Sequence, residues 1–481
     1  MSILSVMSSH SRLTRFSVAW IVTSTIVLVG IVVFFGGGTM EREATLFVLQ
    51  YTSDRPLLQK IFDPHANDLG TYQARELSYL ADYADAVFYR FLYRTFGVAV
   101  FIPLSAVIAT VVCGFIFFRA VARTTRIDLF TSTLIFGCFV SSFVFLSSMA
   151  VFYRSGKPLL AVVLLALLFH LRSIHQDRAG RAGPTSWLTR AGAAAGALAL
   201  LAGLLDRQGV FYVGACCAIL ALHYWWTRQL RDVLVALVVT LAVLQVYNVV
   251  IGPMLVHSLN GYWPDFQYQS LSREHLWRLP IYALLAMQML VENAALLVGG
   301  SVNAAVLLVA ITSAALLLSG GLGRPFLRGS REMWYRLEFR PDLHTVAYLA
   351  LAFGLQVVMF ALMIARHPVV YVSLDHRYWY YTLPYAATVL FGGVILVEAV
   401  IAGASRASVM IIRAGLAVML LANVATLRHH QRVMANGAWF APVSAQSEAA
   451  RRSLRSGSPD PLLQTEYARF VRHHRTMNVS R

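Results

Sequence analysis

The chain has 481 residues, of which 58% are hydrophobic and 13% are charged, and its mean hydropathy is +0.63. A soluble globular domain does not bury so apolar a sequence without aggregating, so the composition predicts an all-α, polytopic membrane protein. The net charge of +17 does not indicate a nucleic-acid partner. The basic residues fall in short loops between apolar segments, where they set the orientation of a membrane protein.

Apolar segments that match the length of a membrane-spanning helix, which needs about 20 residues, recur along most of the chain and predict a transmembrane helical bundle of about 11 spans. We place these spans at residues 16–35, 96–118, 129–152, 158–171, 191–205, 209–226, 233–251, 301–318, 345–365, 383–402 and 407–426. With a cytoplasmic N-terminus, the cytoplasmic segments before the tail hold 17 Lys and Arg against 6 Asp and Glu, as the positive-inside rule requires.

This topology divides the chain into a transmembrane domain, residues 1–426, and a basic C-terminal tail, residues 427–481. Residues 36–95 form a long extracytoplasmic first loop within the membrane domain. The segment 281–300 is long enough to cross the bilayer but contains Glu292 and Asn293 near its middle. We favour an interfacial or re-entrant segment, which leaves the tail on the outer side; a crossing segment would invert everything that follows it.

The first loop holds eight of the 23 carboxylates of the protein, a concentration found nowhere else in the chain. Its second half has apolar and polar residues on opposite sides of a helix, which predicts an amphipathic helix along the outer membrane surface. Asp68 or Thr71 is expected to cap the start of this helix. On a surface helix, Asp82 and Asp85 are expected to be solvated.

Other outward loops carry charged residues next to apolar spans. "FYRSGKP" contains Lys157, and "LLDRQG" places Asp206 and Arg207 between two apolar helices. Charges so close to hydrocarbon are costly and tend to be functional, although a salt-bridged hairpin tip would also explain this pair. "SLDHRYWYYTLP" contains His376 and Arg377 beside aromatic rings, which fit either sugar stacking or an interfacial aromatic belt.

The stretch "RELSYLADYADAVFYRFLYRTFG" from Arg75 is similar to the "RPLS…" helix of some bacterial branches of the GT-C superfamily of membrane glycosyltransferases, with Glu76 replacing the usual proline. The many spans and the long acidic first loop also resemble that superfamily. The resemblance implies a multi-pass enzyme of the bacterial cytoplasmic (inner) membrane with an essential acidic residue in the first loop. Asp68, then Asp63, are the candidates, because both lie just ahead of the helix.

The resemblance further implies transfer of a sugar from a polyprenyl-phosphate carrier to an extracytoplasmic glycan, lipid or protein, with the lipid bilayer as a partner. A carboxylate would accept the proton of the attacking hydroxyl, and cations would bind the departing phosphate. Besides the two candidate bases, the residues expected to contact substrate are Arg75, Glu76, Lys157, Asp206, Arg207, His376 and Arg377.

No metal or cofactor is expected, because the histidines have no Cys or acidic companion at metal-ligand spacing. A secondary transporter or flippase of lipid-linked or small polar substrates is the alternative. Transporters usually keep ionisable residues in the middle of discontinuous helices, whereas these spans are nearly free of charge. We expect Glu398, near the inner end of its span, to pair with Arg406 or Arg413. A non-catalytic scaffold is a third interpretation.

Overall fold

The computed structural model describes residues 16–20, 22–23, 39–40, 42–64, 72–97, 103–124, 127–142, 145, 151–152, 155–178, 185–227, 230–264, 277–286, 382–403, 406–436 and 444–465, with single positions between 348 and 361. The predicted spans 301–318 and most of 345–365 lie outside the described residues, as does most of the segment 281–300. The predicted count of about 11 spans is therefore not tested by the described part of the chain.

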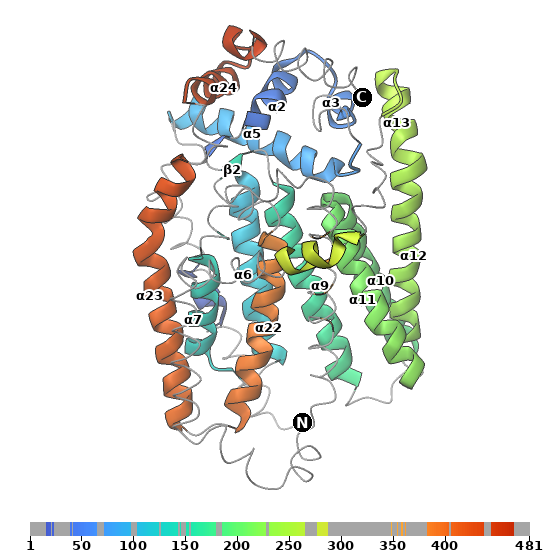
Figure 1. Ribbon diagram of the computed structural model, residues 1–481, viewed down its shortest axis with the longest axis vertical. Helices are drawn as coiled ribbons and strands as arrows, with labels where there is room; N and C mark the ends of the chain where they lie inside the picture. The colour runs from blue at the N-terminus through green and yellow to red at the C-terminus, as the bar shows by residue number, and fades with distance from the viewer. Residues whose placement is uncertain are drawn as a thin grey trace.

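The described part of the protein is an elongated helical bundle whose long helices run along its longest axis (Figure 1). These helices are α6 (Leu104–Thr124), α7 (Leu129–Val140), α9 (Gly156–Arg178), α10 (Thr185–Leu205), α11 (Arg207–Thr227), α12 (Arg231–Val246), α22 (Thr382–Gly403) and α23 (Arg406–Asn436). A π-helical turn, η1 (Tyr247–Ile251), joins α12 to α13 (Gly252–Asn260). The arrangement agrees with the predicted helical bundle.

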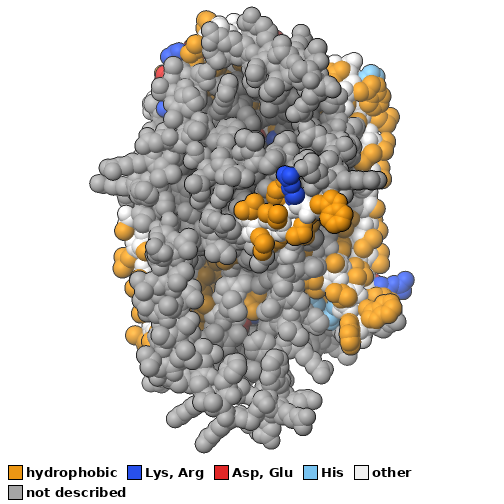
Figure 2. Space-filling view, viewed as in Figure 1, with side chains coloured by type: hydrophobic (Ala, Val, Ile, Leu, Met, Phe, Trp, Pro, Cys, Tyr) orange, Lys and Arg blue, Asp and Glu red, His pale blue; other side chains and the backbone are white. Residues whose placement is uncertain are grey.

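Four stretches among the described helices are long and apolar enough to cross a membrane: Leu104–Arg123, Gly156–His175, Arg207–Trp226 and Arg231–Asn260. The last of these lies at the edge of the bundle, where Figure 2 shows hydrophobic side chains along the outer surface. Val235, Val239 and Val243 are 50%, 54% and 50% exposed there. A continuous exposed valine surface is stable against lipid but not against water, which supports the membrane character of the chain.

Two predicted span boundaries are wrong. The span expected at 96–118 begins instead at Leu104, because Gly97 ends the preceding helix in a left-handed conformation with φ of 65°. In the span expected at 129–152, helix α7 ends at Val140 and residues 141–142 form a turn. The last two residues of the expected span form strand β2 (Val151–Phe152), which pairs in parallel with β1 (Thr39–Met40).

The largest hydrophobic core joins α6, α7, α9, α10, α11 and α22. Its most deeply buried side chains include the phenylalanines Phe117, Phe118 and Phe136, whose rings lie 5.2 to 5.3 Å apart. Such offset and edge-on ring pairs contribute about 0.5–1.5 kcal/mol each beyond their buried area. This core fixes the ends of the helices that support the site described below.

Small residues allow α10 and α12 to pack closely. Gly196 lies against Thr240, and a Cβ built on Gly203 would lie 2.4 Å from a methyl group of Leu244. Small side chains at helix contacts are the usual means by which membrane helices associate, since lipid supplies no hydrophobic driving force. The contact holds α10, and therefore the turn that follows it, in a fixed position.

The bundle contains a buried ion pair between Arg172 of α9 and Glu398 of α22. Arg413, one of the two expected partners of Glu398, pairs instead with Asp128 at 2.8 Å, and the Asp128 carboxylate also caps the start of α7. The side chain of Arg406, the other expected partner, lies outside the described residues. The contact with Arg172 was not predicted because Arg172 lies 226 positions away in the chain.

The opposite end of the bundle is covered by α2 (Arg42–Thr52), α3 (Leu57–Ile61), α5 (Glu76–Phe96) and α24 (Ser444–Ser456). A second core unites three of these helices and contains Phe47 of α2, Tyr79 and Tyr83 of α5, and Leu454 of α24. The tail helix is therefore packed against the first loop.

Candidate functional site

Helix α5 crosses one end of the bundle (Figure 1), and its buried side carries polar residues that include Asp82 and Asp85. Leu80, Val87 and Phe91 on its apolar side are 44%, 57% and 53% exposed, as expected for a helix at a membrane surface. Asp82 and Asp85 are each only 1% exposed, so the expectation that they are solvated is wrong. The helix ends below α5 present backbone N–H groups that need acceptors, and these carboxylates supply them.

The start of α5 also differs from the prediction. The helix begins at Glu76, and Arg75 occupies the cap position without a side-chain hydrogen bond to the helix. Neither Asp68 nor Thr71 is its N-cap. This leaves the Arg75 guanidinium available for contacts below the helix.

Asp85 binds the start of α6. Its carboxylate accepts hydrogen bonds from the backbone N–H of Ser105 at 2.7 Å and from the Ser105 hydroxyl at 2.6 Å. The pKa of Asp85 is raised to about 7, chiefly by burial and to a smaller extent by the nearby Asp82 carboxylate, while the Ser105 hydrogen bonds act in the opposite direction. Asp85 is thus a tertiary cap for α6 with an unusually high proton affinity.

Asp82 makes the equivalent contact with the start of α9. One carboxylate oxygen accepts hydrogen bonds from the backbone N–H of Ser155 at 3.1 Å and from its hydroxyl at 2.7 Å. The Ser155 hydroxyl also lies 2.9 Å from the carbonyl oxygen of Ser78. Together these bonds fix the loop before α9 directly beneath the first turns of α5.

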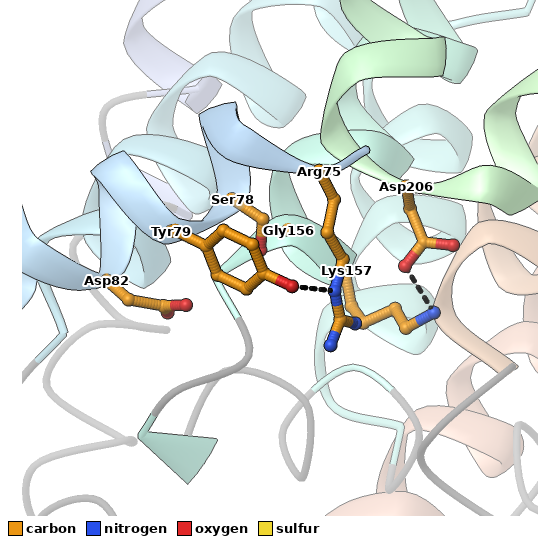
Figure 3. Close-up of a pocket in the computed structure, with 7 residues that line it drawn as sticks. All are labelled: Arg75, Ser78, Tyr79, Asp82, Gly156, Lys157 and Asp206. Carbon is orange, nitrogen blue, oxygen red and sulfur yellow. Dashed lines mark hydrogen bonds and ion pairs between the residues drawn. The ribbon is translucent and has the colours of Figure 1, made fainter. Parts of the chain in front are cut away.

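A small polar cavity lies where α5, α9 and the α10–α11 turn meet (Figure 3). Its volume is about 10 Å³, room for roughly one water molecule. Its wall carries two cations and two carboxylates, an unusual density of charge in so apolar a protein. The residues that line it are Arg75, Ser78, Tyr79, Asp82, Gly156, Lys157 and Asp206.

The centre of the cavity wall is an ion pair between the Lys157 ammonium and the Asp206 carboxylate, whose atoms are 2.7 Å apart. Both residues are buried, at 4% and 6% exposed. Asp206 therefore pairs across the cavity with α9 and does not form a hairpin-tip salt bridge with Arg207. Burial raises the pKa of Asp206, but the Lys157 and Arg75 charges and two hydrogen bonds outweigh it and hold the pKa below its ordinary value.

The local sequence explains how this pair forms. Asp206 interrupts two apolar helices, and its second oxygen accepts the backbone N–H of Gln208 at 2.9 Å, which caps the start of α11. Gly156 at the start of α9 allows the close approach of α5. A Cβ at position 156 would lie 2.4 Å from the Ser78 hydroxyl and 2.9 Å from the Leu205 carbonyl oxygen.

Arg75 enters the cavity from the start of α5, and Figure 3 shows its guanidinium beside Lys157. Its Nε donates a hydrogen bond of 3.0 Å to the Tyr79 hydroxyl, which aims the planar group toward the ion pair. Arg207 and Glu76 lie next to the cavity and share one neighbour. Arg207 donates to the Tyr72 carbonyl at 2.6 Å, and the Tyr72 hydroxyl donates to Glu76 at 2.7 Å.

The structure thus brings together five of the residues that the sequence predicted as substrate contacts, Arg75, Glu76, Lys157, Asp206 and Arg207. His376 and Arg377 lie outside the described residues, as does Asp68.

Asp63 lies in a separate cluster. It accepts hydrogen bonds from Arg55, from the Gln50 amide at 3.3 Å and from the Tyr262 hydroxyl at 2.6 Å. Asn260 donates to the Phe62 carbonyl at 2.7 Å and reinforces the same contact between the first loop and α13. Asp63 is 5% exposed and does not line the polar cavity.

The sequence analysis missed Asp82, Ser155 and Tyr79 as members of the site. The available signal was the polar stripe that recurs every three or four residues along α5. In a soluble amphipathic helix such a stripe faces water, but at the end of a membrane bundle the buried helix N-termini need the polar side. The contact between Asp82 and Ser155 joins residues 73 positions apart and has no local sequence signature.

Within the described ranges, no group of three or more His, Cys, Asp and Glu side chains could hold a metal ion. The cavity instead offers cationic donors, the usual complement of a phosphate. Comparison of the chain with models of protein families, with curated proteins and with solved structures finds no match.

Proposed function

We propose that the protein is a membrane glycosyltransferase of GT-C type, which transfers a sugar from a polyprenyl-phosphate carrier to a glycan, lipid or protein on the extracytoplasmic side of a bacterial inner membrane. The observation that carries the proposal is the polar cavity beneath α5, where Arg75 and Lys157 converge at one end of a membrane-type bundle. Two cations on the wall of a buried cavity match the charged head of a lipid-linked donor.

The reaction needs cations where the donor phosphate leaves. The acceptor oxygen bonds to the anomeric carbon while the bond from that carbon to the phosphate oxygen breaks, and the electron pair stays on the phosphate. Arg75 supplies forked donors and Lys157 a compact charge for this developing anion. Because the cavity is buried, such charges act with little screening by water, and each is worth several kcal/mol.

The Lys157 ammonium has two proposed roles, one without substrate and one with a phosphate bound. Without substrate it neutralises Asp206 at 2.7 Å, which avoids an unpaired buried charge. With a phosphate bound, Lys157 lies between Asp206 and the anion, and Asp206 keeps the ammonium protonated and aimed. The cavity of about 10 Å³ is too small for a sugar phosphate, so binding requires α5 or the neighbouring loops to move outward.

The proton of the acceptor hydroxyl goes to a carboxylate. We propose Asp68 as this base and Asp63 as the second candidate. The Asp63 carboxylate already accepts hydrogen bonds from three side chains, which hold it in the contact between the first loop and α13. A correctly placed base accelerates such reactions by about 10²- to 10⁴-fold.

The proposal is tested with the full-length protein in vesicles that contain a panel of polyprenyl-phosphate-linked sugars. Release of free polyprenyl phosphate, measured by mass spectrometry, is expected in the presence of an acceptor extract. Vesicles without the protein provide the background. Lipid-linked sugar that changes leaflet with its phosphate bond intact would support the alternative, a transporter or flippase, and absence of both results would contradict both functions.

The transporter alternative has one observation in its favour. The buried Arg172–Glu398 pair links α9 and α22 within the bundle. Buried ionisable pairs at membrane depth mark ion pathways in many transporters. The vesicle assay separates this possibility from sugar transfer because only transfer cleaves the donor.

A further inference from the structure

The C-terminal helix α24 packs against helices of the first loop, which is far from it in sequence. Ala449, Ala450 and Leu454 on its inner side are fully buried against α2 and α5. The contact is a packed side-chain core, because three residues on the same side of the helix have no solvent-exposed surface. A tail without a positional function would not need such an interface.

Polar contacts fix the same interface at the end of α24. The Arg455 guanidinium donates to the Tyr89 hydroxyl at 2.9 Å and lies 4.8 Å above the Tyr93 ring. In return, Arg90 and Arg94 of α5 donate to the Ser456 carbonyl at 3.2 and 3.4 Å. Arginines at a helix C-terminus satisfy its unpaired carbonyls and complement its dipole.

Gly457 allows these contacts to form. Its φ of +80° is a left-handed conformation, and its N–H bonds the Ser453 carbonyl at 2.8 Å to end the helix. A Cβ at this position would lie 2.4 Å from the Arg90 guanidinium. Glycine is therefore favoured here by the backbone conformation, and an added methyl group would also displace the Arg90 guanidinium.

One residue of α5 belongs both to this interface and to the polar cavity. Tyr79 is packed in the core that contains Leu454, and its hydroxyl accepts the Arg75 hydrogen bond at the cavity wall. We propose that α24 is a positioning element for the cavity: by clamping α5 from the outer side, it holds Tyr79, and through Tyr79 the Arg75 guanidinium, against the Lys157–Asp206 pair. The inference rests on the proposed function only in taking the cavity to be the functional site.

The experiment compares hydrogen–deuterium exchange of full-length variants in detergent and needs no substrate. In Gly457→Ala, peptides covering residues 75–82 are expected to exchange about threefold faster or more, because loosening α24 lowers the cost of opening α5. Gly261→Ala is the matched control: it has the same kind of left-handed glycine, with φ of +77°, and open space around its Cβ. Faster exchange confined to residues 86–94 and the tail would overturn the proposal.

A second pair of variants keeps the test decisive if Gly457→Ala does not accumulate. Arg455→Gln removes the hydrogen bond to Tyr89 of α5. Arg452→Gln, on the same helix as Arg455, removes an exposed salt bridge to Asp460, which does not belong to α5. Faster exchange at residues 75–82 is expected for the first and not for the second. Equal exchange in both would show that α24 does not position the cavity, whatever reaction the protein catalyses.

Discussion

Two buried carboxylate sites at the same end of the molecule differ in what surrounds them. Asp63 accepts hydrogen bonds from Arg55, Gln50 and Tyr262, and its surroundings join the first loop to α13. Asp206 pairs with Lys157 on the wall of a cavity that Arg75 also enters. In the first arrangement, the Asp63 carboxylate has hydrogen-bond partners and does not line the cavity. In the second, two cations lie beside a cavity that a ligand can enlarge.

The difference teaches that burial and charge alone do not identify a functional site in this protein. The sequence suggested both carboxylates as functional, Asp63 because it lies ahead of the amphipathic helix in the acidic first loop and Asp206 because it lies between two apolar helices. Only the structure distinguishes a carboxylate that connects two segments from one that faces an open cavity. The predictions below test this distinction.

The largest expected effect separates the two candidate bases. Asp68→Asn is expected to lower sugar transfer by about 10²- to 10⁴-fold, because amide nitrogen cannot accept the proton. Asp63→Asn is expected to retain transfer per folded molecule and to lower the melting temperature, because Arg55 loses its partner at a cost of about 1–3 kcal/mol. Transfer is measured as polyprenyl phosphate released, and stability by tryptophan fluorescence on heating.

The opposite pattern would contradict the comparison. If Asp63→Asn abolished transfer with an unchanged melting temperature, the Asp63 cluster would be the catalytic centre and its contact with α13 incidental.

The next largest effect concerns the ion pair. Lys157→Met leaves the Asp206 charge buried without its partner, and we expect a loss of about 3–5 kcal/mol in stability. The double variant Lys157→Met/Asp206→Asn removes both charges and keeps the cap on α11, so most of the loss is expected to be recovered. The coupling free energy between Lys157 and Asp206 is obtained from the melting temperatures of the unmodified chain, the two single variants and the double variant. Additive losses would show that the two side chains do not interact.

Close packing at the start of α9 gives a smaller effect. Gly156→Ala places a methyl group 2.4 Å from the Ser78 hydroxyl and is expected to cost about 1–3 kcal/mol through displacement of α5. Gly214→Ala in α11 is the control, since nothing lies within 4 Å of its added Cβ. The two variants are compared by melting temperature and by polyprenyl phosphate release. Equal behaviour would mean that α5 does not need to approach α9 so closely.

The last effect is a pH dependence from Asp85. Its folded pKa of about 7 lies above the ordinary 3.8, so the folded state keeps a proton that the unfolded chain releases. This group therefore adds stability below pH 3.8 that is lost as the pH rises toward 7. In Asp85→Asn the fall in melting temperature between these pH values is expected to flatten. An unchanged pH profile would show that Asp85 titrates at its ordinary value.

Much of the fold could be predicted from composition and run length. Continuous apolar segments are unambiguous for helices, which is why α9, α10, α11, α22 and α23 overlap the predicted spans. The errors fall where a single backbone conformation decides the result. Gly97 ends α5, so that α6 begins later in the chain than predicted. The β1–β2 pairing lies at the end of a segment that is apolar enough to be a helix. Neither feature has a periodic signal.

The site was predictable in its residue types and less so in its geometry. Lys157, Asp206 and Arg207 stood out because charges beside hydrocarbon are costly. Their partners did not stand out, since the contacts join residues such as Lys157 and Asp206 that are 49 positions apart. The environment of the polar side of α5 was the main error for Asp82. An acid on a surface helix is usually solvated, whereas here the polar side is buried against the ends of α6 and α9.

The most direct test measures binding of polyprenyl phosphate, the product common to every donor of this class, to the purified protein in lipid nanodiscs. We predict that Lys157→Met/Asp206→Asn binds it at least about tenfold more weakly than the unmodified chain, since a charge-assisted hydrogen bond contributes about 1.5–3 kcal/mol. Uncharged polyprenol should bind both proteins equally. Equal affinity of the two proteins for polyprenyl phosphate would contradict the assignment of the cavity beneath α5 as the phosphate site.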